Sequence, residues 1–169
     1  MAQKAITIYT PPTANPHIYA EDEAQTNRAR FGGSGILDVD GSLACTAIDN
    51  NTVRLASGMY CCQGYLLSVP GGSTEDLPVI SGTAGMYRKD LVIAEFIRGG
   101  GAVADELVFR VLKGTAAATE AAAVPPTLTQ DNLGAGGSVR QEALYQINLY
   151  GISIQTITRI ASFVGNFYA

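Results

Sequence analysis

The sequence has no tryptophan, one histidine and only three cysteines, and these scarcities remove several classes of site. A serine–histidine–aspartate triad needs a firmly held histidine, whereas His17 lies in a segment bounded by prolines. An odd number of cysteines, two of them adjacent, does not form a disulfide framework. We therefore interpret Cys45, Cys61 and Cys62 as reduced, small core hydrophobes. The alternative, a soft-metal site, would have only His17 as a further ligand.

Positive charge and long apolar runs are also scarce. The 169 residues carry 11 Lys and Arg against 15 Asp and Glu, a net charge of −4, and the basic residues are scattered. Because phosphate binding needs clustered basic residues, this composition argues against a nucleic-acid partner. No run is long enough to span a bilayer, and the first residues lack the apolar core of a signal peptide. We expect a protein made in the cytoplasm, with no signal peptide and no membrane insertion.

Glycine is abundant, with 19 residues, but no glycine-rich stretch matches a nucleotide-binding motif. Residues 32–35 are not followed by Gly-Lys-Ser/Thr, and residues 134–137 do not open a βαβ unit. Asp38 and Asp40 flank a turn without completing a calcium loop. We therefore predict no catalytic, cofactor-binding or metal-binding residues, and not an enzyme.

Two groups of carboxylates keep a glycoside-hydrolysing alternative open. One is the pair Asp105 and Glu106, and the other consists of Glu21, Asp22 and Glu23. Paired carboxylates are the requirement for glycoside hydrolysis. Both groups are more simply interpreted as solvated surface charge, so a cell-wall polysaccharide hydrolase is the weakest of the alternatives.

The clearest structural pattern is a pair of apolar runs around the glycine-rich residues 99–101. The first run, residues 87–97, carries apolar side chains on both faces of a strand: Val92, Ala94 and Phe96 on one, and Leu91, Ile93 and Ile97 on the other. The second run, residues 107–112, alternates in the same way. This predicts a long β-hairpin inside a sandwich or barrel rather than on a surface.

About nine short strands, separated by turn signals, predict a mainly β protein, an antiparallel β-sandwich or barrel. Besides that hairpin, the strands are expected at residues 35–40, 43–48, 52–56, 59–69, 74–80, 142–150 and 152–160. Gly58 and the Pro-Gly-Gly of residues 70–72 are expected to interrupt strands, and a tight turn near Gly151 to join the last two. The alanine-, proline- and glycine-rich residues 115–139 are expected to form a surface connector.

A single helix is predicted over residues 20–31. Its first turn is acidic, its last turn contains Arg28 and Arg30, and Gly32 follows it, an order that complements the helix dipole. Because Phe31 is its one large apolar side chain, we expect it on the surface, with a polar interface as the alternative. Prolines in residues 11–16 predict that residues 1–19 form an extended arm, and that residues 20–169 form one β-rich domain.

Charged and aromatic residues of the predicted helix, of the start of the hairpin and of the last residues of the chain are candidates for an interface. Arg88 and Lys89 could clamp the acidic helix by ion pairs, although ordinary surface charge is the simpler interpretation. The apolar end, residues 162–169, is expected to dock against the core or a partner. The candidate interface residues are Glu21, Asp22, Arg28, Phe31, Arg88, Lys89, Phe163, Phe167 and Tyr168. The eight tyrosines could stack on sugar rings if several shared an exposed face.

Three short sequence strings are distinctive: Ile-Tyr-Ala-Glu-Asp-Glu-Ala at residues 18–24, Arg-Phe-Gly-Gly-Ser-Gly-Ile-Leu at 30–37, and Tyr-Arg-Lys-Asp-Leu-Val at 87–92. With residues 51–58, 64–67, 82–94 and 107–114 they resemble small tail proteins of phages and prophages of Firmicutes-type bacteria. The likeness covers roughly residues 4–160. Its strings are structural, so it implies no active site.

The resemblance implies a virion component of the tail tip or baseplate, or the attachment module of a tail fibre. Such modules are typically β-rich and often trimeric, so we expect a homo-oligomer that docks to other phage tail proteins. We expect no shaft or receptor-binding head to follow the module, which favours an adaptor or structural role. The alternative is a carbohydrate-binding, receptor-recognition domain that contacts a host cell-surface glycan.

Overall fold

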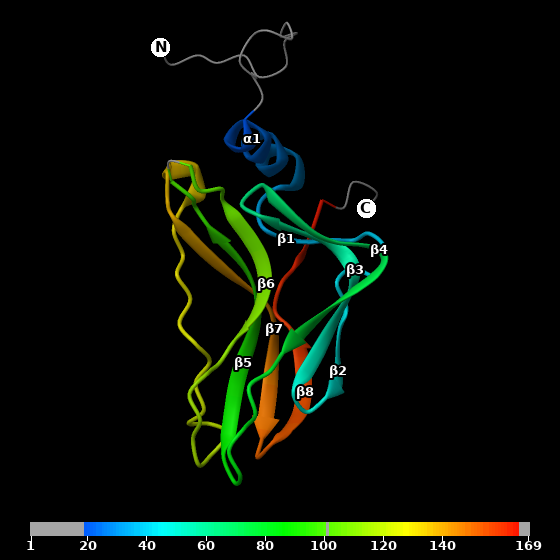
Figure 1. Ribbon diagram of the computed structural model, residues 1–169, viewed down its shortest axis with the longest axis vertical. Coiled ribbons are helices and arrows are strands. Elements are labelled where there is room, and N and C mark those ends of the chain that lie inside the picture. Colours follow the sequence, from blue (N-terminus) through cyan, green and yellow to red (C-terminus); the bar gives the residue numbers. More distant parts are fainter. Residues whose placement is uncertain (1–18, 101, 166–169) are drawn as a thin grey trace, which may run out of the picture.

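One helix and two β-sheets make up the part of the chain that the computed structural model describes, residues 19–100 and 102–165 (Figure 1). Helix α1 (Ala20–Phe31) is followed by strands β1 (Gly35–Leu37), β2 (Cys45–Asp49), β3 (Thr52–Cys62) and β4 (Tyr65–Pro78). The later elements are β5 (Tyr87–Ile97), β6 (Glu106–Leu112), the 3₁₀ helix η1 (Leu133–Ala135), β7 (Val139–Tyr150), β8 (Ser153–Arg159) and β9 (Phe163–Val164). The predicted mainly β fold with one short helix is confirmed.

The strands form two sheets that face each other. In sheet 1, β3 pairs with β4 along one edge, and with β2 and β1 along the other. Strand β9 adds to β1 in parallel, and every other pairing of strands in the described residues is antiparallel. Sheet 2 has the order β6-β5-β7-β8. This is the sandwich that the spacing of strands predicts.

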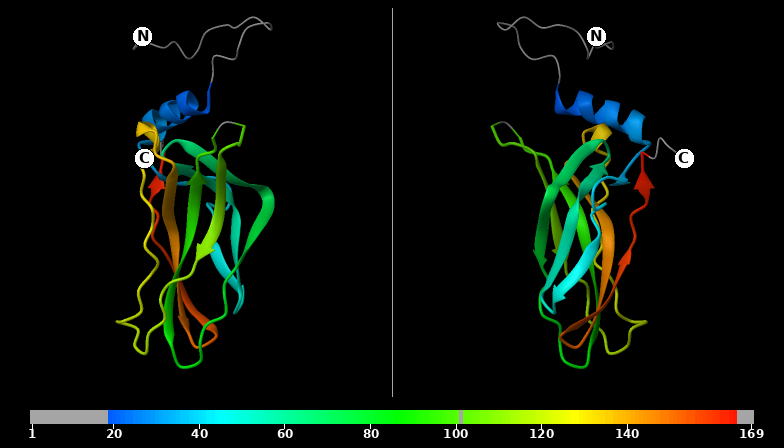
Figure 2. Two further views of the ribbon diagram at one scale, coloured as in Figure 1. Left: turned by 60° about the vertical axis from the view of Figure 1, so that its left-hand side comes forward. Right: turned by 90° about the vertical axis from the view of Figure 1, so that its right-hand side faces the viewer.

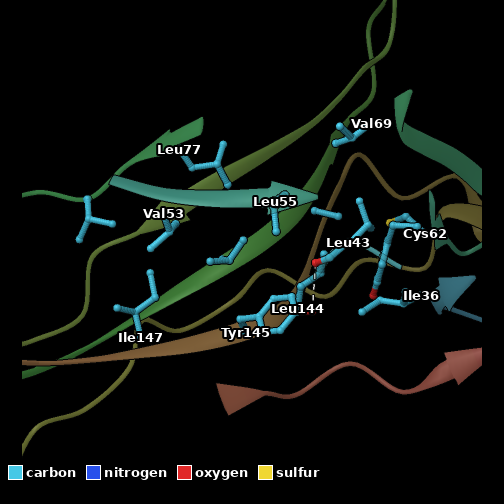
Figure 3. Close-up of a cluster of buried hydrophobic side chains, with 14 of the residues drawn as sticks. Ile36, Leu43, Val53, Leu55, Cys62, Val69, Leu77, Leu144, Tyr145 and Ile147 are labelled. Carbon is cyan, nitrogen blue, oxygen red and sulfur yellow. Dashed lines mark hydrogen bonds between the residues drawn. The ribbon is translucent and has the colours of Figure 1, made fainter. Parts of the chain in front are cut away.

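The core lies between the two sheets (Figure 3). Val53 and Leu55 of β3 pack there with Leu144 and Ile147 of β7, and all four side chains are fully buried. Tyr145 also reaches across, because its hydroxyl donates a hydrogen bond to the Leu43 carbonyl oxygen over 3.0 Å. Burying each of these side chains contributes roughly 1.5–3 kcal/mol to the stability of the fold. The sandwich is therefore a stable scaffold for the helix and loops at its two ends.

The hairpin predicted from residues 87–114 is confirmed as β5 and β6, with Leu91 opposite Leu112 and Phe96 opposite Leu107. Val92 and Phe96 belong to the core. Ile93, on the opposite face, is fully buried as well. The connector explains this burial, because it pairs with Tyr87 at Ala117 and with β7 at residues 129–131, and so crosses the outer face of sheet 2.

Two predicted strand breaks are wrong. Strand β3 runs through Gly58, where its register with β4 shifts, and β4 runs through residues 70–72. A side chain at Gly58 would meet the backbone of Leu43, so this glycine marks a close approach within the sheet rather than an end. The turn between the two strands is instead at Gln63 and Gly64, which both have positive φ angles, 47° and 96°.

Helix α1 spans the predicted residues and lies across one end of the sandwich (Figures 1 and 2). Gly32 adopts the left-handed conformation, with φ of 77°, and its N–H bonds to the Arg28 carbonyl oxygen. Within the described residues, no helix is long and apolar enough to cross a membrane. The predicted arm of residues 1–19 lies outside the described residues, apart from Tyr19.

Candidate interface at the helix pole

The helix rests on the turn between β3 and β4. Asn27 is buried in this contact and donates a hydrogen bond from Nδ2 to the Gly64 carbonyl oxygen over 3.1 Å. A side chain at Gly64 would overlap the carbonyl oxygen of Ala24. Gly64 is therefore needed twice, for its positive φ angle and for the close approach of the helix backbone. We call the region formed by α1, residues 133–137 and β9 the helix pole.

Arg98 ties the helix to the rest of this pole. Its guanidinium donates hydrogen bonds to the carbonyl oxygens of Gly137 (3.0 Å) and Leu133 (3.2 Å), and lies 3.4 Å from the Glu21 carboxylate. A hydrogen bond to Tyr65 raises the pKa of Arg98 above its usual value. Sequence reasoning missed this residue. The signal was an arginine at the end of an apolar strand, directly before the glycines of residues 99–101.

A cleft of about 370 Å³ opens between α1, Tyr65 and residues 133–136. It is lined by carboxylates, from Glu21 and Asp22, and by guanidinium groups, from Arg28 and Arg98. The cleft therefore presents both negatively and positively charged side chains. Such a lining suits the mixed charges and amide groups of a protein surface better than a ligand of one charge sign.

Exposed aromatic residues lie at the same pole. Phe163 of β9 is 41% exposed, and the Arg159 guanidinium lies 4.3 Å from the centre of its ring. Tyr19, directly before α1, is 47% exposed. A side chain at Gly165 would come within 2.8 Å of the Phe31 ring. The described chain therefore starts and ends at the helix pole (Figure 2).

The structure brings five of the candidate interface residues together. Glu21, Asp22, Arg28, Phe31 and Phe163 all lie at the helix pole, although Asp22 is buried, at 8% exposure. Phe167 and Tyr168 lie outside the described residues. Arg88 and Lys89 are near the opposite end of β5, nine and eight residues before Ile97, which is about 26–30 Å along the strand at about 3.3 Å per residue.

Arg88 is not the helix clamp or the surface charge that the sequence suggests. It is 2% exposed and pairs with Asp90, which is fully buried, at 2.8 Å. The remaining donors of Arg88 bond to the carbonyl oxygens of Ser81 (3.0 Å) and Ile80. Asp90 Oδ1 also accepts the N–H of Gly114 over 2.9 Å. The pair therefore fixes the start of β5 to the segments on either side of it.

A second buried polar cluster joins the two sheets close to the helix pole. Glu142 of β7 is 6% exposed and accepts hydrogen bonds from the Tyr60 hydroxyl (2.9 Å), the Ser34 hydroxyl (2.9 Å) and Arg140 Nε (2.8 Å). Burial, followed by the charge of Glu142, raises the pKa of Tyr60. Tyr60 thus stays a donor at neutral pH, and Glu142 locks the sheets in register.

The other groups considered from the sequence have structural contacts. Asp105 accepts the N–H of Gly99 over 2.8 Å and closes the β5–β6 loop, whereas Glu106 lies 3.5 Å from Arg110. Asp38 accepts a hydrogen bond from the Ser42 hydroxyl over 2.8 Å. Within residues 19–100 and 102–165, no three His, Cys, Asp or Glu side chains come together as metal ligands would.

The cysteines are free thiols, as predicted. Cys61 and Cys62 are fully buried. Burial raises the pKa of the partly buried Cys45 to about 12 and that of Cys62 further. A thiol that stays protonated is a poor nucleophile, so these residues act as core side chains.

No protein-family model matches the sequence, and a search of curated proteins finds no match either. The geometry of the helix pole and the resemblance of the sequence strings are therefore the grounds for a functional proposal.

Proposed function

We propose that the protein is a non-enzymatic structural component of a phage tail tip or baseplate, or a tail-fibre adaptor, and that it belongs to the virion. It acts by self-association, as a trimer, and by docking to other tail proteins through the helix pole. One observation carries the proposal: α1, the exposed aromatic residues and both ends of the described chain gather at a single end of a rigid sandwich (Figure 2). The sequence strings that resemble small phage tail proteins support it.

The charge order of α1 favours a closed ring of copies. Glu21 and Glu23 are exposed in its first turn, and Arg30 is exposed in its last turn. In a head-to-tail interface, the acidic start of one helix can face the basic end of the next, and such an interface closes into a ring when the rotation allows. A trimer is the smallest ring that this geometry forms.

Light scattering coupled to size exclusion tests the proposal. We expect a mass of about three times the 17.7 kDa of the chain at low ionic strength. The variants Glu23→Lys and Arg30→Glu should each weaken the trimer, because like charges then face each other. The double variant should restore it, because the complementary order is reversed as a whole.

Lys113→Glu is the matched control, since Lys113 is exposed but lies outside the helix pole. It should leave the mass unchanged. A wild-type protein that stays monomeric at high concentration would contradict the proposal, as would single helix variants that assemble like the wild type.

A further inference from the structure

A cleft of about 280 Å³ is lined by residues at the start of β5 and the end of β7. These two strand ends lie at the end of the sandwich opposite α1 (Figure 1). Tyr87 and Tyr150 are paired across these two strands and form its aromatic wall. Their ring centres are 4.6 Å apart and the ring planes are tilted by 39°. Tyr150 is 45% exposed, so one ring of the pair is open to a ligand. We call this site the tyrosine cleft.

The wall of the tyrosine cleft is held rigidly. The backbone of Tyr87 exchanges two hydrogen bonds of 2.8 Å with Ala117 of the connector, and Gly151 N–H bonds to the Met86 carbonyl oxygen over 2.9 Å. The buried Arg88 lies beside it, fixed by Asp90. A site that is ordered before binding loses little conformational entropy when a ligand arrives.

Polar groups surround the aromatic wall and come from three separate elements. Glu120 is contributed by the connector, Asn148 by β7, and Gln155 and Thr156 by β8. The Asn148 amide is held between Gln146 Nε2 and Thr156 Oγ1, with both bonds 2.8 Å long. The side-chain amides of Asn148 and Gln155 each still have one N–H and one oxygen lone pair that can bond to a ligand. The rim therefore presents both donors and acceptors.

We propose that the tyrosine cleft binds one neutral pyranose ring, the terminal sugar of a glycan. The C–H face of the ring stacks on Tyr150, while vicinal hydroxyls, each both a donor and an acceptor, bond to the amides and to Glu120. The volume lies just below the roughly 300–1,000 Å³ of sites for drug-sized ligands, so it suits a single sugar. An apolar ligand would leave the rim groups unpaired, and a charged sugar would meet both Lys89 and Glu120, whose opposite charges line the same cleft.

Saturation-transfer NMR and calorimetry with a panel of methyl pyranosides test this proposal. The panel contains glucose, galactose, N-acetylglucosamine, N-acetylgalactosamine, rhamnose and glucuronic acid. We expect saturable binding of at least one neutral sugar with a Kd on the order of 1 mM, and no tighter binding of the glucuronide than of the glucoside, because Lys89 and Glu120 offer opposite charges. Absence of saturable binding by every neutral sugar at about ten times that concentration, or tightest binding of the glucuronide, would overturn the proposal.

Tyr150→Ala should weaken binding by about tenfold or more, because the stacking surface is removed. Tyr19→Ala is the matched control, since Tyr19 is equally exposed but lies at the helix pole, and it should bind like the wild type. Gln155→Ala provides a second test that leaves both rings in place and should also reduce affinity. If Tyr150→Ala and Gln155→Ala both bind like the wild type, the sugar is bound elsewhere and the assignment is wrong.

The proposed function at the helix pole is tested independently of this site. The mass of the oligomer should be the same for Tyr150→Ala as for the wild type, because the cleft is at the other end of β5. Loss of sugar binding with an intact trimer therefore reports on the cleft alone.

Discussion

Asp90→Ala should destabilise the protein strongly, because the Asp90 carboxylate pairs with the buried Arg88. The substitution leaves a guanidinium group that is 2% exposed without its counter-charge, and leaves the N–H of Gly114 without its acceptor. Removing one partner of a buried pair costs about 3–5 kcal/mol. The unpaired Gly114 N–H places the expected loss at the upper end of this range.

Such a loss is large but leaves the chain folded at room temperature if its stability lies above the lower end of the usual range of about 5–15 kcal/mol. For a domain of this size the thermal midpoint should fall by about 6–20 °C. Arg88→Met should cost a similar amount. The double variant should cost less than the sum of the two, because no unpaired charge stays buried. It should not reach wild-type stability, since the carbonyl groups of Ile80 and Ser81 lose their donor.

Urea unfolding followed by circular dichroism measures these differences. The matched control is Asp76→Ala, which breaks the ion pair of Asp76 with Arg54 at 2.6 Å. Those two side chains are 45% and 41% exposed, and exposed pairs contribute little, so the control should unfold close to the wild type. The reasoning is refuted if Asp90→Ala lowers the free energy of unfolding by less than about 1 kcal/mol.

Three further outcomes follow from the contacts described above. Gly64→Ala should lose about 1–3 kcal/mol and expose α1 to hydrogen exchange, since its Cβ overlaps Ala24 and its φ angle is 96°; unchanged protection of residues 20–31 would contradict this. Tyr60→Phe should lose about 1.5–3 kcal/mol in urea unfolding, because the buried Glu142 loses the hydroxyl as a hydrogen-bond donor; a wild-type midpoint would show that the hydroxyl is dispensable. Finally, stability should fall as pH rises from 9 towards 12, because the unfolded Cys45 releases its proton near 9.0 while the folded thiol keeps it to about 12. Cys45→Ala should make this decline shallower, and an identical slope would assign the decline to other groups.

The sequence predicts those parts of the fold that local patterns determine. The helix over residues 20–31 follows from its acidic start, basic end and closing glycine, and the β5–β6 hairpin from its alternating apolar residues. The β7–β8 hairpin around Gly151 follows in the same way. In each case the residues that specify the element are neighbours in the sequence.

The features that sequence reasoning missed depend on contacts between distant residues. Gly58 indicates a break until its approach to Leu43 is known, and Gly64 indicates no more than a turn until α1 is placed on it. Arg88 belongs to a polar string that indicates a surface, yet the carbonyl groups of Ile80 and Ser81 make its burial favourable. Arg98 became part of the candidate site only through its contacts with Leu133 and Gly137.

The parallel pairing of β9 with β1 determines how the protein responds to tension. A pull between Tyr19 and Gly165 loads β1 at its amino end and β9 at its carboxyl end, so the two strands are sheared lengthwise rather than peeled apart. The pair consists of Ile36 opposite Phe163 and Leu37 opposite Val164, with a further bond from Ile36 N–H to Ser162. The pairing of β1 with β9 is short, so it breaks under a force that leaves the longer strand pairings of both sheets intact. The sandwich therefore stays folded after its last strand is released.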